Sequence, residues 1–201
     1  MYLFPPDPAA NLLPCDGTVH YLGRVLGIAE AWKFHDALLE KVPWKQDEAI
    51  IFGRRVVTAR EVAWYGDASF RYTYSGTTKE ALPWNEELRA LKELVEQRTA
   101  TSFNSCLLNL YHDGSEGMAW HSDDEKSLGR HATIASLSLG AERKFCLKHK
   151  RRPASVSMLL EHGSLLVMKD ATQTNWLHSI PKSKRILEPR INLTFRTMTG
   201  V

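Results

Sequence analysis

The chain has 201 residues, of which 43% are hydrophobic and 24% are charged, a composition that fits one folded domain and excludes a disordered or fibrous chain. Its formal net charge of +3 is too small to establish a polyanionic partner unless the basic residues cluster. The three cysteines are far apart and form no CxxC pair, which argues against a disulfide framework or a thiolate zinc site and indicates a reducing compartment.

The N-terminal segment, residues 1–20, is expected to be irregular. Its opening "MYLFPPDPAANLLP" has no basic start and is broken by prolines, so it does not read as a signal peptide. No apolar run in the chain approaches the roughly 20 residues that a transmembrane helix needs. We therefore expect an intracellular protein that does not enter a membrane, cytoplasmic in a bacterium or nuclear in a eukaryote.

Two amphipathic helices are predicted, over residues 27–42 and 85–99. In the first, apolar and aromatic residues recur at helical spacing, at Ile28, Trp32, His35, Leu38 and Leu39. The second has the same spacing of leucines, and Asn85 is placed to cap its N-terminus. Both helices are expected to support a sheet.

Short apolar or alternating runs follow residue 100, separated by Gly, Asp, Asn and Pro, and predict many short strands. A helical opening followed by such strands is typical of a β-sandwich or barrel buttressed by helices. Residues 49–76 are aromatic, basic and rich in turns, and we expect a hairpin assembly outside the main core.

A possible metal site begins at "WHSDDE", residues 120–125. Residues at i and i+2 of a strand point to the same face, so His121 and Asp123 can bind one cation, but the pair alone is a weak signal and a chance pair on a polar turn is the simpler explanation of it. Two histidines and one carboxylate with open positions are typical of non-haem Fe(II) oxygenases. The later candidates for the second histidine are His131, His149, His162 and His178.

The last predicted strand, "RINLTFR" (190–196), alternates polar and apolar residues and places Arg190 and Arg196 on one face. Paired guanidiniums on an inner face require an anion, and a dicarboxylate could accept a bidentate contact from each. An outer, solvated face of the strand is the alternative.

Five stretches then carry a family resemblance: "NLY" (109–111), "WHSDDE" (120–125), "HGSLLVM" (162–168), "NWLHSIPK" (175–182) and "PRINLTFR" (189–196). Their order and spacing over residues 45–197 resemble the AlkB family of Fe(II)- and 2-oxoglutarate-dependent dioxygenases. "FGRR", "YGDA" and "YTYSG", within residues 52–76, are similar to the nucleic-acid-repair branch.

The resemblance implies a single domain over 1–201. It would be α+β and mainly β, with a double-stranded β-helix (jelly-roll) core at 100–198, supporting N-terminal helices and a nucleotide-recognition lid at 45–80. It implies Fe(II), 2-oxoglutarate and O2 as cofactors. His121, Asp123 and His178 look like the iron ligands. The residues that look like the 2-oxoglutarate site are Arg190, Tyr111 and Asn192 for the distal carboxylate, and Arg196 and Asn109 for the proximal one.

The implied reaction is oxidative demethylation of bases such as 1-methyladenine and 3-methylcytosine, which releases succinate, carbon dioxide and formaldehyde and needs no separate side-chain acid or base. The base must leave the stack to reach the iron. The residues that resemble base contacts are Trp64, Tyr72, Tyr74, Ser75, Asp124 and Glu125. The expected DNA contacts are Phe52 and Gly53, as an inserted finger, with Arg54, Arg55, Lys182, Lys184 and Arg185.

Further phosphate contacts are expected from Arg143, Lys148, Lys150, Arg151 and Arg152. Trp120 and Ser122 are more similar to relatives that favour single strands, whereas Phe52 and residues 182–185 are more similar to those that favour duplexes, so strand preference stays open. The expected partner is alkylated DNA, with RNA as an alternative, and one copy of the chain suffices. A catalytically inert nucleic-acid-binding β-barrel is the rival reading.

Overall fold

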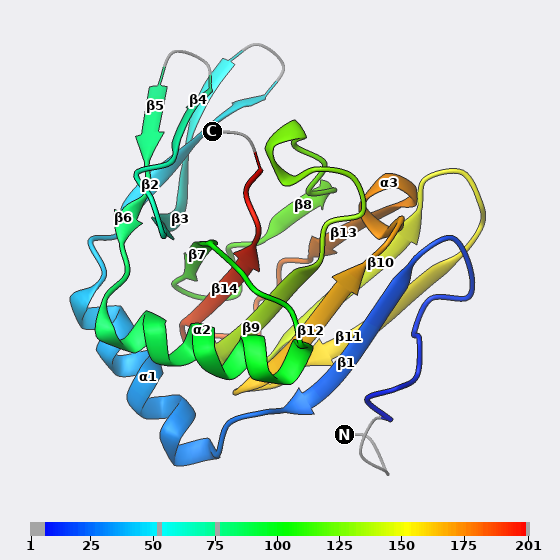
Figure 1. Cartoon of the computed structure of the whole chain (residues 1–201), viewed down its shortest axis with the longest axis horizontal. Coiled ribbons are helices and arrows are strands. Elements are labelled where there is room, and N and C mark those ends of the chain that lie inside the picture. Colours follow the sequence, from blue (N-terminus) through cyan, green and yellow to red (C-terminus); the bar gives the residue numbers. More distant parts are fainter. Residues whose placement is uncertain (1–6, 52–53, 75–76, 200–201) are drawn as a thin grey trace.

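Two antiparallel sheets pack face to face, with two helices against the outer side of the larger one (Figure 1). The computed structural model describes residues 7–51, 54–74 and 77–199, with only the backbone at 48–51, 54–56, 71–74 and 77–79. The major sheet has the strand order β1-β12-β9-β14-β7-β3-β2, with β6 added beside β3, and the minor sheet has the order β11-β10-β13-β8.

The strands of the major sheet are β1 (Thr18–Arg24), β2 (Lys45–Ile51), β3 (Arg54–Gly66), β6 (Leu82–Pro83), β7 (Ser105–Tyr111), β9 (Ile134–Gly140), β12 (Ser164–Lys169) and β14 (Arg190–Arg196). Those of the minor sheet are β8 (Met118–His121), β10 (Arg143–His149), β11 (Ser155–Leu160) and β13 (Trp176–Ile180). A separate pair comprises β4 (Arg71–Tyr74) and β5 (Thr77–Glu80). The expected mainly β, jelly-roll architecture is confirmed.

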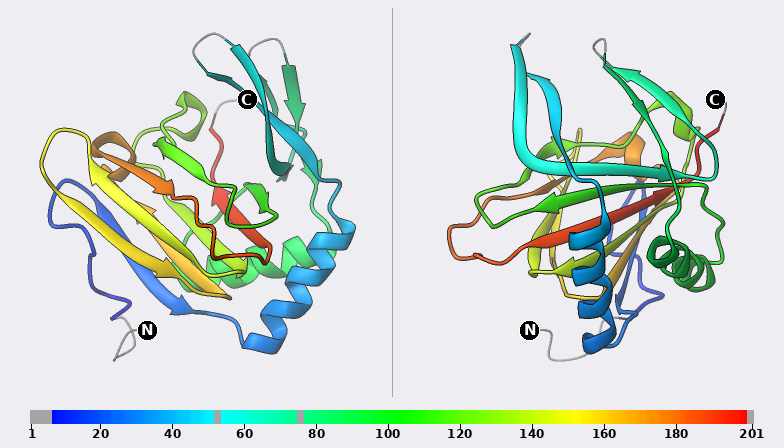
Figure 2. Two further views of the ribbon diagram at one scale, coloured as in Figure 1. Left: turned by 180° about the vertical axis from the view of Figure 1, so that it is seen from behind. Right: turned by 90° about the vertical axis from the view of Figure 1, so that its left-hand side faces the viewer.

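Two apolar layers hold this arrangement together. Between the sheets, Ile134 and Leu166 of the major sheet pack with Phe145, Leu147 and Trp176 of the minor sheet. Behind the major sheet, residues of α1 (Ile28–Lys41) and α2 (Glu86–Thr99) pack on its outer face. Figure 2 shows both helices on this side of the molecule. The inner face of β14 contributes no residue to the layer between the sheets and presents the polar residues that build the site.

Both predicted helices are confirmed, and so is the cap, because the Asn85 side chain accepts a hydrogen bond of 2.8 Å from the Leu88 N–H. The apolar face of α1 differs from the expectation. Ala31, His35 and Leu38 are buried, whereas Ile28 is 57% exposed and Trp32 41% exposed. The small Ala31 lets the helix approach the sheet, so only a narrow seam of α1 is covered.

The region expected to stand outside the core is only partly separate. The end of β3 pairs with β7, from Glu61 opposite Leu110 to Gly66 opposite Ser105, and its side chains Val62 and Tyr65 are buried. The first part of β3 pairs with β2, and this hairpin and β4–β5 project together beyond the sheet (Figure 1). We call these two hairpins the lid hairpins.

The expectation of an irregular segment as far as residue 20 is wrong for its last residues. Strand β1 starts at Thr18, which is opposite Lys169 of β12, so β1 forms an edge of the major sheet. Among the helices in the described ranges, none has the length and apolar character needed to span a membrane.

The cap at Asn85 gives a first prediction. Asn85→Ala removes the acceptor for the Leu88 N–H and should lower the free energy of unfolding by about 1 kcal/mol, measured by urea denaturation. Asn85→Asp keeps an acceptor oxygen and should retain most of the stability. Equal losses in the two variants would contradict the assignment of the effect to the cap.

Candidate active site

Three side chains that could hold a metal meet between the two sheets. His121 ends β8, and it lies directly opposite His178 of β13 in the minor sheet, with ring centroids 4.2 Å apart. Asp123 follows β8 and reaches both rings, with an oxygen 3.9 Å from each Nε2. One ligand atom from each residue lies within 4.8 Å of the others. The pairing of β8 with β13 and the loop after β8 therefore bring together the ligand set of a two-histidine, one-carboxylate metal site.

Hydrogen bonds around these residues fix their orientation. The Nδ1 of His121 lies 2.9 Å from the Ala119 carbonyl oxygen, to which it can donate only as Nδ1–H, and this leaves the Nε2 lone pair free for a metal. The Asp123 N–H donates to Oε1 of the buried Gln173, at 2.9 Å. Gln173 belongs to α3 (Thr172–Asn175), which directly precedes β13 and His178.

Lys150 holds the same loop from the other side. Its ammonium donates to the Ser122 hydroxyl at 3.0 Å and to the Gln173 carbonyl oxygen at 2.9 Å. It also lies 3.9 Å from Asp124. Lys150, expected as a phosphate contact, is thus committed to positioning the loop that carries Asp123.

The electrostatics favour binding of a cation. Burial alone would raise the pKa of Asp123, but Arg196, His178 and His121 outweigh it and lower the pKa of the carboxyl below its usual value. Burial lowers the pKa of His178 to about 4. At neutral pH the site therefore offers a carboxylate and a neutral imidazole, the protonation states that a metal needs.

Next to the metal site, the inner face of β14 provides a site for an anion. Arg190 is 1% exposed, its Nη2 donates to the Ser138 hydroxyl at 2.9 Å, and its guanidinium lies 5.4 Å from the Tyr111 ring centroid. Its Nε and Nη1 have no hydrogen-bond partner among the described residues. Burial lowers the pKa of Arg190 to about 10. A buried guanidinium with two unused donors matches a carboxylate of 2-oxoglutarate, so the residues fit this co-substrate.

The other residues expected at the co-substrate are on the same face, but more of their polar atoms already have protein partners. Arg196 lies 3.2 Å from Asp123 through Nη2, while its Nε is buried without a partner in the described part of the chain. The Asn192 side chain donates to the Ser136 hydroxyl at 2.8 Å. Asn109 accepts a hydrogen bond from Arg60, a buried third guanidinium on β3 that the sequence analysis missed.

The remaining histidines do not join this site. The Nδ1 of His162 accepts from the Gly140 N–H at 2.8 Å, and His131 lies in an exposed turn with a φ of 60°. His149 forms a second cluster with Cys15 and Asp16. Its Nδ1 accepts the N–H groups of Arg151 and Arg152, so in the neutral ring the Nε2 carries the proton and is not free to bind a metal.

The residues expected to contact the base and the DNA are distributed unevenly. Phe52, Gly53 and Ser75 lie outside the described residues, and only the backbone of Arg54, Arg55, Tyr72 and Tyr74 is described, within the lid hairpins. Trp64 is half-buried and donates to the Ser105 hydroxyl at 2.7 Å. Exposed side chains are those of Asp124 and Glu125, beside the metal site, and of Lys182, Lys184 and Arg185, between β13 and β14.

One expected phosphate contact is wrong. Arg143 is 1% exposed, and its guanidinium donates to the backbone carbonyl oxygens of Asp113, Glu116 and Pro181. It therefore ties together two loops in the interior and cannot reach a phosphate.

Comparisons with known proteins agree with this geometry. The model of the 2OG-Fe(II) oxygenase superfamily matches residues 18–196. The human alpha-ketoglutarate-dependent dioxygenase alkB homolog 3 is 44% identical over 181 residues, which are 85% of this chain and 63% of that protein. The human DNA oxidative demethylase ALKBH2 is 43% identical over 198 residues, or 93% of this chain and 74% of that protein. The chain thus spans less than two thirds of the length of the first of these relatives.

Solved structures share the fold. A structure of OsALKBH1 has a TM-score of 0.57 at 15% identity and covers 98% of this chain and 99% of that chain. A 2OG-Fe(II) oxygenase family oxidoreductase from Burkholderia pseudomallei has a TM-score of 0.58 at 14% identity and covers 90% of this chain and 84% of that chain. These identities are low, so the likeness concerns the fold alone.

The support given to Asp123 by Gln173 gives a second prediction. Gln173→Ala leaves the Asp123 N–H without its acceptor, and loss of such a supporting group typically weakens metal affinity about 10- to 100-fold. Calorimetric titration with Mn(II) under anaerobic conditions measures the effect. Asn175→Ala, on the same short helix but bonded to the Asp16 carbonyl oxygen, is the matched control and should bind the metal as the unaltered protein does. Equal metal affinity in Gln173→Ala and the control would refute the role of Gln173.

Proposed function

The chain belongs to the AlkB family of the 2OG-Fe(II) oxygenase superfamily, and from that membership we propose that it is an enzyme that oxidatively removes N-methyl groups from bases in DNA. Its cofactors are Fe(II), 2-oxoglutarate and O2. The observation that carries the proposal is the pairing of the His121, Asp123 and His178 cluster with a buried Arg190 that has unused donors.

Each residue of the site has a proposed part in binding. His121, Asp123 and His178 would hold the iron. Arg190, with Tyr111 and Asn192, would hold the distal carboxylate of 2-oxoglutarate, and Arg196 with Asn109 would hold the proximal one. When bound, Fe(II) and 2-oxoglutarate activate dioxygen for hydroxylation of the N-methyl group, which then leaves as formaldehyde.

Asp123 of the proposed metal site and Arg196 of the proposed co-substrate site contact each other. Arg196 Nη2 lies 3.2 Å from the Asp123 carboxylate, which would therefore lie between the proposed positions of the metal and the co-substrate. The pair keeps both side chains oriented before either group binds, so less reorganisation is required on binding. The closed sheets around His178 and Arg190, both buried, exclude water from this end of the site.

The base would be presented from the side of the half-buried His121 and the exposed residues that follow Asp123. Asp124 and Glu125 are exposed next to Asp123, and carboxylates at this position would attract the positive charge of 1-methyladenine or 3-methylcytosine. We assign base contacts to Tyr72, Tyr74, Ser75 and Trp64 as well. We assign contacts with the DNA backbone, or insertion into the space that the flipped base leaves in the stack, to Phe52, Gly53, Arg54, Arg55, Lys182, Lys184 and Arg185.

We propose further that the chain is one dioxygenase domain, with a lid within 45–80 and a jelly-roll core within 100–198. Flipping one base requires one copy of the protein, so a monomer suffices. A substrate in genomic DNA would place the protein in the nucleus of a eukaryote or the cytoplasm of a bacterium.

The decisive experiment offers oligonucleotides that carry 1-methyladenine or 3-methylcytosine, with Fe(II), ascorbate and 2-oxoglutarate. We expect loss of 14 mass units, about one methylene equivalent, and release of formaldehyde. His121→Ala should show neither, because it removes a metal ligand. Parallel assays with single-stranded DNA, duplex DNA and RNA rank the substrates. Turnover of 2-oxoglutarate without demethylation would refute methylated bases as the substrate. Demethylation of RNA but not of DNA would refute DNA as the substrate and identify RNA instead.

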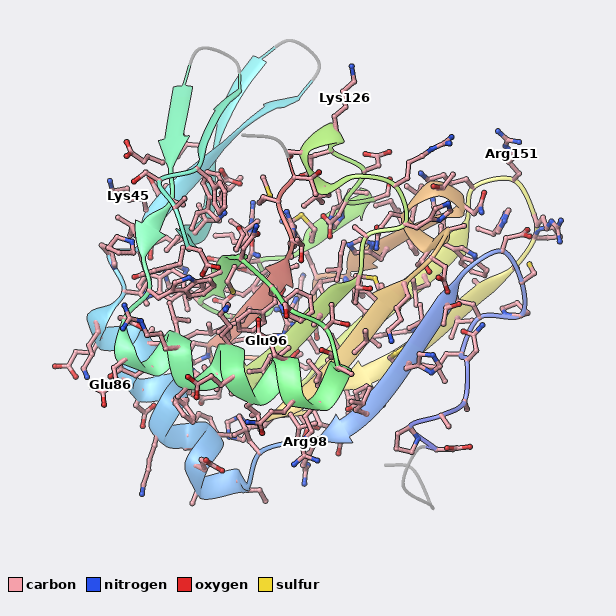
Figure 3. The ribbon with its side chains drawn as sticks, viewed as in Figure 1. Lys45, Glu86, Glu96, Arg98, Lys126 and Arg151 are labelled. Carbon is pink, nitrogen blue, oxygen red and sulfur yellow. The ribbon has the colours of Figure 1, made fainter. Side chains whose placement is uncertain are left out.

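A third prediction concerns Arg190. Arg190→Lys keeps a positive charge but loses the planar donor pair, and hydrogen bonds to charged groups contribute about 1.5–3 kcal/mol, so the KM for 2-oxoglutarate should rise at least about tenfold. Arg98→Lys is the matched control, because Arg98 is exposed at the end of α2, away from the sheet interior (Figure 3). An unchanged KM in Arg190→Lys would show that Arg190 does not bind the co-substrate.

A further inference from the structure

A tryptophan stands exposed directly beside the metal site. Trp120 precedes His121 in β8, which is the edge strand of the minor sheet, and it is 42% exposed. In the register of this sheet His121, His178 and Leu147 lie opposite one another on the inner face. Trp120 and Lys148 are each the neighbour in sequence of a residue in this row. Because successive side chains of a strand point to opposite faces, both lie on the outer face.

Lys148 defines the orientation of the exposed ring. Its Nζ lies 4.4 Å from the centroid of Trp120, which is within the range of a cation–π interaction. The contact spans two strand spacings, from β10 to β8 across β13. A tryptophan held in this way keeps its flat surface in one place before any ligand arrives.

The exposed side chains around Trp120 are basic and polar. Lys144 and Lys148 occupy alternate outward positions on β10, and exposed serines Ser155 and Ser157 lie on the neighbouring strand β11. Lys144, Lys148 and Arg151 have no acidic partner within 4.0 Å among the residues that the structure describes. Leu177 and Leu159 lie on the same face but are half-buried, so Trp120 is the one exposed large apolar side chain among the described residues of this face, and a partner that needs an extended apolar patch fits poorly.

These residues follow β10 to the turn after it, which lies on the right in Figure 3, whereas the lid hairpins lie on the left. Figure 2, left, views the minor sheet from its outer side, and Figure 3 places Arg151 on the projecting turn after β10. Lys144 and Lys148 are four residues apart, or about 13 Å along the strand. The arrangement combines one flat aromatic surface with positive charges in a row, which is how proteins bind single-stranded nucleic acid.

We propose that Trp120, Lys144, Lys148 and Arg151 bind the single strand that flanks the reacting nucleotide. A neighbouring base stacks on the Trp120 ring, and the phosphates of the strand pair with the three basic side chains. We call this surface the Trp120 platform. The proposal rests on the proposed function, which brings the reacting nucleotide to His121, the residue after Trp120.

The test compares two tryptophans of equal exposure. Trp120→Ala removes the platform, whereas Trp32→Ala removes a tryptophan that is 41% exposed on α1 and packs against His162, with ring centroids 4.3 Å apart. Loss of one stacked base costs about 1–3 kcal/mol, so Trp120→Ala should weaken binding of an unmodified single-stranded DNA 12-mer about 5- to 100-fold. Fluorescence anisotropy at fixed salt measures this, and Trp32→Ala should bind as the unaltered protein does.

Lys148→Gln provides a second, independent measurement. It removes one charge from the platform, so the slope of log affinity against log salt should become shallower by about one unit or slightly less. With a methylated mononucleotide, which has no flanking strand, Trp120→Ala should lose a smaller fraction of its turnover than with a methylated 12-mer. Unfolding of each variant in urea checks that the exposed positions leave stability unchanged.

The outcomes separate this proposal from the proposed function. If Trp120→Ala and Trp32→Ala bind the 12-mer equally well, the platform is refuted, and demethylation by the unaltered protein would still support the enzyme. If Trp120→Ala loses affinity for a duplex but not for the single strand, the partner we assign to the platform is wrong. If the unaltered protein demethylates nothing but binds the single strand through Trp120, the platform stands and the proposed reaction fails.

Discussion

The structure is organised around a charged group that lies where charge is expensive. Arg190 is buried between two sheets, and only one of its donors has a protein partner in the described part of the chain. Moving an ion out of water costs several kcal/mol unless a counter-charge and hydrogen bonds replace the solvent. The sandwich tolerates this cost because its own apolar layers, between the sheets and under the helices, are complete without the polar face of β14. The fold thus contains a buried polar region that can bind an anion.

The metal position depends on the same division of faces. Strands β8 and β13 bring two imidazoles side by side, while the carboxylate arrives on a loop and needs separate support. Gln173 and Lys150 supply it from α3 and β10, through the backbone of Asp123 and the side chain of Ser122. Residues that never touch the metal therefore determine whether three ligands point at one place.

The sequence was most informative where local pattern decides structure. The helices, the cap at Asn85, the alternating faces of β14 and the pairing of His121 with Asp123 all follow from spacing within a few residues. It was least informative where distant strands meet. Gln173 is 50 residues from Asp123 in the sequence, and Arg60 is 49 residues from Asn109. No local sequence pattern predicts either contact. Arg143 looked like a surface cation for the same reason, since only the closed fold shows the carbonyl oxygens that surround it.

The position of β8 at the sheet edge has a further consequence. This strand has four residues and, among the described strands, pairs with β13 alone, so few backbone hydrogen bonds anchor it. A metal held by His121 and His178 would act as a cross-link between the edge strand and its neighbour. Trp120 lies on that strand, so if the proposed platform binds nucleic acid, metal occupancy and that binding would be thermodynamically linked, each strengthening the other by the same factor. Under the proposed function, a molecule without metal would hold damaged DNA more weakly than a molecule that can act on it.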